Sequence, residues 1–319
     1  MQAEVRLRHR FVTAVMLSLG LMNEYTKRGK TYTALEEAYI AVGYAPDYLP
    51  LHRRVGDILW EGGLQEAALA KYQAIADTYQ VRGDSRQSMA IYERILTFMP
   101  MDVQLRGKLI DLYIRHKDMD KALEQYVALA DTHYQLADLD AAREKYQEAM
   151  KHVPRAANAR QWAQQILHKI GDLDMQRVDW RRSIQDFEQI KAIIPDDDQA
   201  RLKLVELRYK TNDTARAIKE LDELLLMYNN TGRAAKIIPV LQEQVQAHPA
   251  EMSLRMRLGR ALVSAGLTEQ AVEQLDALGD LQLQAGLTKD AAATIKGIIS
   301  LNPPNVAQYR QILAQLSSS

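Results

Sequence analysis

Histidine, cysteine and clustered acidic residues are the side chains that most often carry catalysis or bind metals, and this sequence offers few arrangements of them. Its seven histidines are scattered along the chain, and it contains no cysteine. Thiolate zinc sites, disulfides and cysteine nucleophiles are therefore excluded. Neither a metalloprotease H-E-x-x-H pair nor a glycine-rich phosphate-binding motif occurs. We therefore predict that the chain is not an enzyme and that it uses no cofactor and no metal ion.

Two basic clusters and one acidic run are the other short segments that suggest binding chemistry. His52–Arg54 and Trp180–Arg182 bring guanidinium groups together, and the second adds an aromatic ring, a combination that can stack on nucleobases. Basic and acidic residues balance at 41 each, so the chain as a whole has no electrostatic preference for nucleic acid or anionic membrane. We interpret both basic clusters as solvated helix faces. Asp196–Asp198 is interpreted as the cap at the start of a helix.

The elements that must position these residues are predicted to be helices. Proline and glycine are scarce, at 9 and 15 of 319 residues, and strong helix formers dominate the sequence. The apolar run Phe11–Met22 follows three arginines, as in a secretory signal peptide. It is shorter than the roughly 20 apolar residues that span a bilayer, and no small-x-small cleavage pattern follows it. We interpret it as part of a repeated helix.

Prolines reveal the repeat. Six of them form two groups of three in which neighbours are 54 residues apart, and 41 residues separate the groups: Pro46, Pro100, Pro154, and then Pro195, Pro249, Pro303. The residue 32 positions before each of these prolines is always alanine, and the residue 12 positions before is small in five of the six. Small residues let two helices pack closely, and proline ends the helix that precedes it. The spacing therefore predicts a tandem helical repeat.

One copy of the repeat shows large, small and aromatic positions in a familiar order: Tyr72, Ile75, Ala76, Tyr79, Gly83, Ser88, Tyr92, Ile95 and Pro100. This order resembles the tetratricopeptide repeat (TPR) family, whose motif pairs two antiparallel helices. The resemblance implies an all-α, TPR-like right-handed α-solenoid, a superhelix of about 17 antiparallel helices.

The repeats overlap, because two "small" positions such as Ala68 and Ser88 are only 20 residues apart. The second helix of one motif then serves as the first helix of the next, which gives three helices per repeat: 48–61, 64–82 and 85–99 in the first complete one. We predict a single solenoid over residues 1–319. Its parts are a partial repeat at 1–46, complete repeats at 47–100, 101–154, 196–249 and 250–303, a repeat at 155–195 that lacks its first helix, and a capping helix and tail at 304–319.

Acidic residues occupy one recurrent position of the repeat. In the resembled family this position, two residues after a large residue of the first helix, often faces the ligand groove. Members that clamp a C-terminal carboxylate have asparagine there with Lys or Arg four residues before, so clamping is not expected here. We predict a partner-binding groove suited to a basic segment, with solvation of a helix face as the alternative; its candidate residues are Arg53, Asp57, Asp77, Asp111, Asp131 and Glu206.

These observations predict a cytoplasmic scaffold or adaptor that presents an extended helical surface to a protein or peptide partner, and that binds neither nucleic acid nor membrane. One alternative is a repeat domain of a larger regulatory or assembly protein. Another is an RNA-binding helical repeat, which would need a basic stripe in phase with the repeat, whereas the phased charges are acidic.

Overall fold

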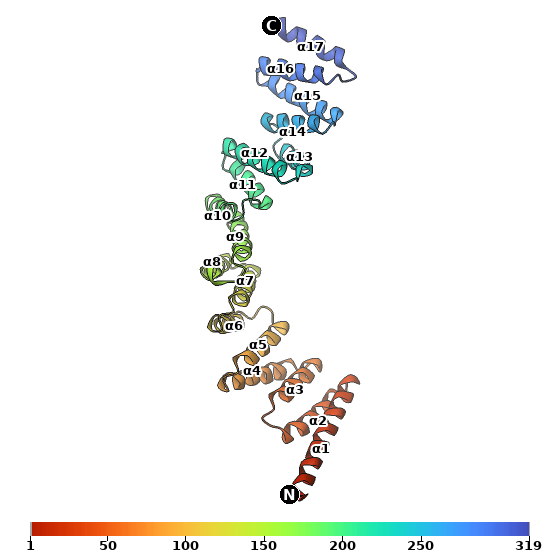
Figure 1. Cartoon of the computed structure of the whole chain (residues 1–319), viewed down its shortest axis with the longest axis vertical. Helices are drawn as coiled ribbons and strands as arrows, with labels where there is room; N and C mark the ends of the chain where they lie inside the picture. The colour runs from red at the N-terminus through yellow and green to blue at the C-terminus, as the bar shows by residue number, and fades with distance from the viewer. Residues whose placement is uncertain (1, 319) are drawn as a thin grey trace. The chain divides into compact units, whose positions relative to one another are not determined.

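A computed structural model of the chain describes residues 2–318, and the side chains of residues 13–316. Within that range it contains seventeen α-helices, two short 3-10 helices and no β-strand (Figure 1). The predicted all-α fold and number of helices are thereby confirmed. Met1 and Ser319, the ends of the predicted solenoid, lie outside the described residues.

The chain divides within α9 into two compact units, Met1–Ile166 and Leu167–Ser319, here called the N-terminal and C-terminal units. The N-terminal unit contains α1 (Gln2–Lys27), α2 (Thr31–Tyr44), α3 (Leu49–Glu61), α4 (Gln65–Val81), α5 (Ser85–Phe98), α6 (Val103–Arg115), α7 (Met119–Gln135), α8 (Leu139–His152), η1 (Val153–Arg155) and the start of α9 (Ala159–Gln176). The C-terminal unit contains the rest of α9, α10 (Trp180–Ile193), α11 (Asp198–Lys210), α12 (Thr214–Asn230), η2 (Ala234–Lys236), α13 (Ile237–Ala247), α14 (Met252–Ser264), α15 (Thr268–Gln284), α16 (Thr288–Ser300) and α17 (Val306–Ser318).

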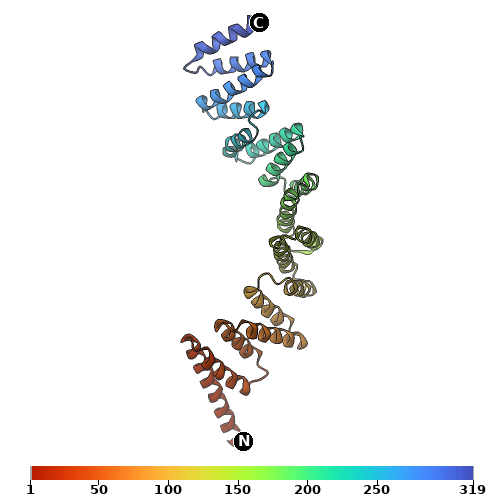
Figure 2. The same cartoon turned by 180° about the vertical axis from the view of Figure 1, so that it is seen from behind.

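Within each unit the helices pack mainly against the helices that precede and follow them in sequence. Short turns reverse the chain between them, as Figures 1 and 2 show from two sides. Ion pairs also join helices two apart in the chain, such as Arg94 of α5 to Asp57 of α3 and Lys191 of α10 to Glu220 of α12. Odd-numbered helices of a unit therefore form one layer and even-numbered helices form the other. Each unit is a TPR-like α-solenoid.

Capping residues in the sequence determine where many of the helices begin. Aspartates at the N-cap accept a hydrogen bond from the backbone N–H three residues further on, which satisfies one of the free donors of the first helical turn. These aspartates are Asp84, Asp102, Asp118, Asp138, Asp179, Asp197 and Asp213. The cap made by Asp197 is the role predicted for the Asp196–Asp198 run.

The turns that end many helices share one backbone conformation. The second residue after the helix has a positive φ at Gly29, Gly63, Gly83, Gly232, Gly266 and Gly286, and also at Lys117, Ala137, Val178, Asn212 and Asn302. Glycine adopts this left-handed conformation without steric cost. Val178, with φ 62°, is the least suited of these residues because its side chain is β-branched.

We expect Val178→Gly to raise the free energy of unfolding by about 1 kcal/mol, because an L-residue in the left-handed region costs roughly 1–2 kcal/mol and glycine has a larger conformational entropy to lose. Val178 is 63% exposed, so the substitution removes little buried surface. Urea unfolding followed by circular dichroism measures the change. The reverse substitution at an equivalent turn, Gly83→Val, should destabilise the chain, and a Val178→Gly protein no more stable than its parent would contradict the assignment of strain.

Small residues line the contacts between helices, as the repeat predicts. Ala68, Ala122, Ala142, Ala217 and Ala271 have no exposed surface. Their short side chains let the backbones of adjacent helices approach closely. Large residues such as Tyr72, Tyr146 and Phe187 fill the space beside them and are themselves fully buried or nearly so.

One side-chain contact recurs after the prolines. An arginine six residues further on donates from its Nε to the proline carbonyl: Arg106 to Pro100 at 3.1 Å, Arg201 to Pro195 at 2.9 Å, and Arg255 to Pro249 at 3.0 Å. The Nη1 atom of each arginine also reaches a side chain of the following helix, namely Gln125, Glu220 or Gln274. The arginine thus joins the start of one helix to the next helix.

The chain after Pro154 differs from this pattern. Here η1 and a short loop lead directly to α9, and Arg160, six residues after the proline, lies on α9 and is exposed. Asp120 of α7 secures this junction instead. Its carboxylate accepts from the backbone N–H groups of Ala157 and Asn158 at 3.0 and 3.3 Å, and from Trp162 Nε1 at 2.8 Å.

Candidate functional site

The predicted acidic residues are distributed over both layers. Asp57 lies on α3 and Asp131 on α7, whereas Asp77 lies on α4 and Asp111 on α6. A peptide that follows one layer of the N-terminal unit would therefore reach two of these residues and not the other two. Glu206 lies on α11, in the C-terminal unit.

Three of the four aspartates in the N-terminal unit accept a hydrogen bond from a tyrosine fifteen residues further along the chain. The hydroxyl of Tyr72 donates to Asp57 at 2.5 Å, that of Tyr92 donates to Asp77 at 3.4 Å, and that of Tyr146 donates to Asp131. Burial, together with the adjacent carboxylate, raises the pKa of all three tyrosines. The aspartates therefore satisfy buried hydroxyl groups between successive helices.

Further contacts hold two of these aspartates. Arg94 of α5 donates to Asp57 at 3.3 Å, and the Asp57 side chain is only 17% exposed. Gln73 donates to Asp77 at 2.9 Å. A basic segment bound at these positions would compete with the existing contacts. Asp111 and Arg53 are both exposed.

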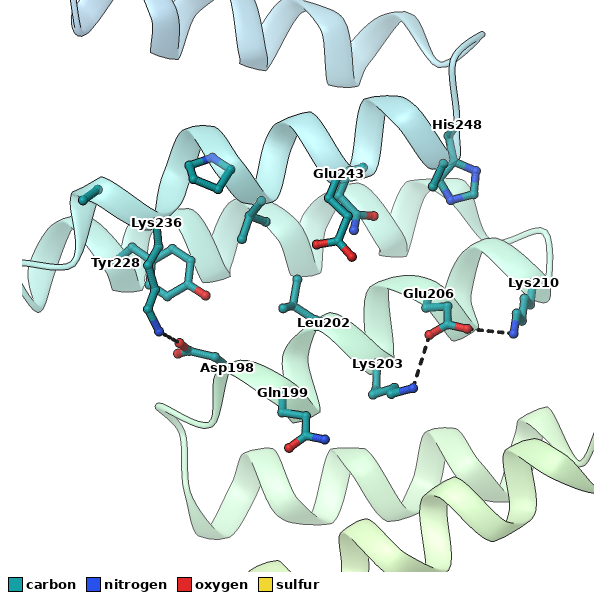
Figure 3. A pocket seen from close by; sticks show the side chains of 15 residues that line it. Asp198, Gln199, Leu202, Lys203, Glu206, Lys210, Tyr228, Lys236, Glu243 and His248 are labelled. Carbon is teal, nitrogen blue, oxygen red and sulfur yellow. Dashed lines mark hydrogen bonds and ion pairs between the residues drawn. The ribbon is translucent and has the colours of Figure 1, made fainter.

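Glu206 belongs to a groove that the sequence did not reveal as a whole. The groove, here called the α11–α13 groove, has a volume of about 880 Å³ and lies between α11 and α13, with Tyr228 contributed by α12 (Figure 3). Its lining residues are Asp198, Gln199, Leu202, Lys203, Glu206, Lys210, Tyr228, Ala235, Lys236, Pro239, Val240, Glu243, Gln244, Ala247 and His248.

Helical spacing explains why these residues share one groove. On α11, Leu202, Glu206 and Lys210 are four residues apart, so they lie along one face. On α13, Val240 and Gln244 have the same spacing. Leu202, Val240, Pro239 and the alanines supply apolar surface, while charged side chains border it.

Ion pairs fix most of the charged groups along the groove. Glu206 pairs with Lys210 at 2.7 Å and with Lys203 at 3.6 Å, and although burial would raise it, these lysines hold the pKa of Glu206 below its ordinary value. Asp198 pairs with Lys236 at 2.6 Å and with Arg233 at 2.8 Å. Figure 3 shows the pairs of Glu206 and the Asp198–Lys236 pair along the groove.

Aromatic residues stand at both ends of the groove. Tyr228 lies beneath the cations of Arg233 and Lys236, whose distances from its ring centre are 5.3 and 5.6 Å. Burial, assisted by Asp198, raises the pKa of Tyr228 to about 12, so the phenol is neutral at physiological pH. At the other end, the ring of His248 stacks on Tyr209 with 3.9 Å between centroids.

Glu243 is the rim carboxylate without an ion pair among the residues that the structure describes. It is exposed and projects from α13 into the groove. It is therefore free to accept a hydrogen bond from a bound lysine or arginine.

The groove combines an apolar floor with charged rims. Its carboxylates are separated by lysines or exposed, and no histidine in it is paired with a carboxylate. Among the side chains that the structure describes, those of residues 13–316, no group of three or more His, Asp or Glu is arranged to hold a metal ion. No described helix is long and apolar enough to cross a membrane.

No family model matches the chain, and no curated protein matches it. Solved structures similar to it include MamA, which is 17% identical over 50% of this chain and 97% of that chain, with a TM-score of 0.31. The TPR2AB domain of yeast Sti1, solved in complex with pHSP90, is 13% identical over 91% of this chain and 99% of that chain, with a TM-score of 0.31. A Rap protein complexed with competence and sporulation factor is 13% identical over 93% of this chain and 76% of that chain, with a TM-score of 0.38.

Proposed function

We propose that the chain is a protein-interaction scaffold and that its α11–α13 groove binds an amphipathic segment of a partner protein. The observation that carries this proposal is the groove itself, which joins about 880 Å³ of concave space to an apolar floor and charged rims. A groove of this kind accepts apolar anchor side chains, while its polar rim fixes their orientation. A repeat domain within a larger regulatory or assembly protein would use the groove in the same way.

The chemistry of the lining residues restricts the partner. Leu202 and Val240 favour an apolar anchor residue at the centre of the segment. Glu243, which has no ion pair among the described residues, favours a lysine or arginine beside that anchor. The partner segment is therefore apolar on one face and basic at its edge, in keeping with the basic partner that the sequence predicts.

Photocrosslinking tests where the partner binds. A photoreactive amino acid at Gln199 or Gln244, which line the groove, should capture the same partner from cell extract. The same amino acid at Gln242, an exposed residue of α13 outside the groove, should not capture it. Equal capture at all three positions would refute binding in the groove.

Leu202→Glu should weaken binding of the purified partner by about tenfold or more, since burial of a leucine side chain contributes about 1.5–3 kcal/mol. The matched control is Leu226→Glu, which makes the same change at a leucine of α12 that is 59% exposed and lies outside the groove. A further variant replaces the aspartates at 57, 77, 111 and 131 with asparagine. If this variant loses affinity for the partner while the Leu202→Glu variant does not, the binding site lies in the N-terminal unit and not in the groove.

A further inference from the structure

A second hollow lies in the opposite layer of the C-terminal unit, between α10 and α12, with a volume of about 550 Å³. It is lined by five arginines and lysines but only three glutamates, and Ile184 is the apolar residue at its base. The α11–α13 groove, in contrast, has as many lining lysines as acidic residues. The two hollows therefore differ in charge as well as in the layer they occupy.

All three glutamates of this hollow are already paired with cations. Lys191 bonds to Glu220 at 2.5 Å and to Glu223 at 3.0 Å, and Arg201 reaches the same two carboxylates from beneath, at 2.9 and 3.5 Å. The bond from Lys191 lowers the pKa of Glu223, so this carboxylate is ionised in the pair. Glu188, the third glutamate, pairs with Arg208 of α11.

The cations at the mouth of the hollow are not neutralised in this way. Arg181 on α10 and Lys219 on α12 are exposed, and neither forms an ion pair with any residue that the structure describes. Arg216 contacts Asp213 at 3.4 Å, but its side chain is 68% exposed. Since the hollow's own acids are occupied, Arg181 and Lys219 present uncompensated positive charge on both sides of one concave surface, and the exposed Arg216 lies one turn from Lys219.

From this arrangement we propose that the α10–α12 hollow binds an acidic segment of a partner protein, rich in aspartate or glutamate. Carboxylates of the segment pair with Arg181 on one rim and with Arg216 and Lys219 on the other. Because the hollow and the α11–α13 groove open on opposite layers, both can be occupied at once. This proposal does not depend on the function of the α11–α13 groove.

The probe for this site is a fluorescent peptide in which glutamate and alanine alternate, compared with a peptide that carries glutamine in place of glutamate. The glutamate peptide should bind at low salt and weaken as salt rises, because exposed charges more than about 8 Å apart are screened at physiological ionic strength. The glutamine peptide should not bind. Equal binding of the two peptides would overturn the proposal.

The double variant Arg181→Glu with Lys219→Glu should weaken the glutamate peptide by about tenfold or more, since it reverses one charge on each rim. The control is Lys289→Glu with Lys296→Glu, which makes the same change in net charge at two exposed lysines of α16 that do not line the hollow. It should change affinity by less than about twofold. Equal losses in the two variants, with circular dichroism showing both folded, would mean that only the net charge matters and would overturn the site.

A label can locate the bound peptide directly, because the chain has no native cysteine. A fluorophore attached at Gln185→Cys, inside the hollow, should respond to the glutamate peptide, and one at Gln242→Cys on α13 should not. A response at residue 242 alone would refute the assignment. Tighter binding of a single-stranded oligonucleotide than of the peptide at equal salt would replace the acidic segment with nucleic acid.

Discussion

Phe187→Ala should lower the free energy of unfolding by about 3–5 kcal/mol, the largest effect we expect from a single substitution in this chain. The Phe187 side chain is fully buried between α9 and α10. Its ring lies against Gly171, where an added Cβ would stand 2.9 Å from two ring carbons. The hydroxyl of Ser183, also on α10, joins the two helices at the same point by donating to the Gly171 carbonyl at 2.8 Å. The ring therefore fits a space that only glycine leaves open.

A double-mutant cycle isolates this contact. Gly171→Ala alone should cost about 1–3 kcal/mol through overpacking. It should cost clearly less in a Phe187→Ala background, because the ring carbons that the new Cβ would meet are then absent. The control is Gly297→Ala on α16, where nothing lies within 4 Å of the new Cβ, and where helix propensity predicts a gain of roughly 0.5–1 kcal/mol. Strictly additive effects at residues 171 and 187 in chemical unfolding would contradict the contact.

Asp120→Ala should cost about 2 kcal/mol, since hydrogen bonds to a charged group are worth roughly 1.5–3 kcal/mol and Asp120 accepts several. The loss should be local to the junction between η1 and α9. Hydrogen exchange at Ala157 and Asn158 should accelerate, because their N–H groups lose their acceptor. Glu124→Ala, at an exposed glutamate one turn further along α7, is the control and should leave this exchange unchanged.

Asp120 also predicts a pH dependence. The hydrogen bond from Trp162, followed by the bonds from the backbone at 157 and 158, lowers the pKa of Asp120 below its ordinary value. The stability it contributes is therefore fully present above the pKa of an unfolded aspartate and is lost as the pH falls through the lower, folded value. Exchange at Ala157 should accelerate on acidification in the parent protein and be less pH-sensitive in Asp120→Asn, after correction for intrinsic exchange. An equal response in both would contradict the assignment.

Sequence reasoning located the helices well because their boundaries depend on residues close together in the chain. α3, α4 and α5 begin and end within one residue of the predicted 48–61, 64–82 and 85–99. Aspartate caps, left-handed turn residues and prolines act within a few residues of a helix end, so they can be identified without any tertiary contact. The buried alanines were identifiable for the same reason, since the repeat returns them to the same helix face.

The roles of the acidic residues depended on contacts between helices. Asp57, Asp77 and Asp131 share a recurrent position, and a tyrosine fifteen residues later was present in the sequence as a signal. The spacing alone does not reveal that the helix register brings each hydroxyl onto its carboxylate, nor that the four aspartates are divided between two layers.

The proposed binding surfaces were decided by tertiary structure alone. The α11–α13 groove brings Leu202 and Glu243 together across an intervening helix, and the α10–α12 hollow places Arg181 opposite Lys219. The sequence by itself determined that this chain is an array of helices, because helix formation and termination are encoded by neighbouring residues. Which charges are paired and which face open space was decided only by the packing of alternate helices, since an ion pair depends on distances between residues far apart in the chain.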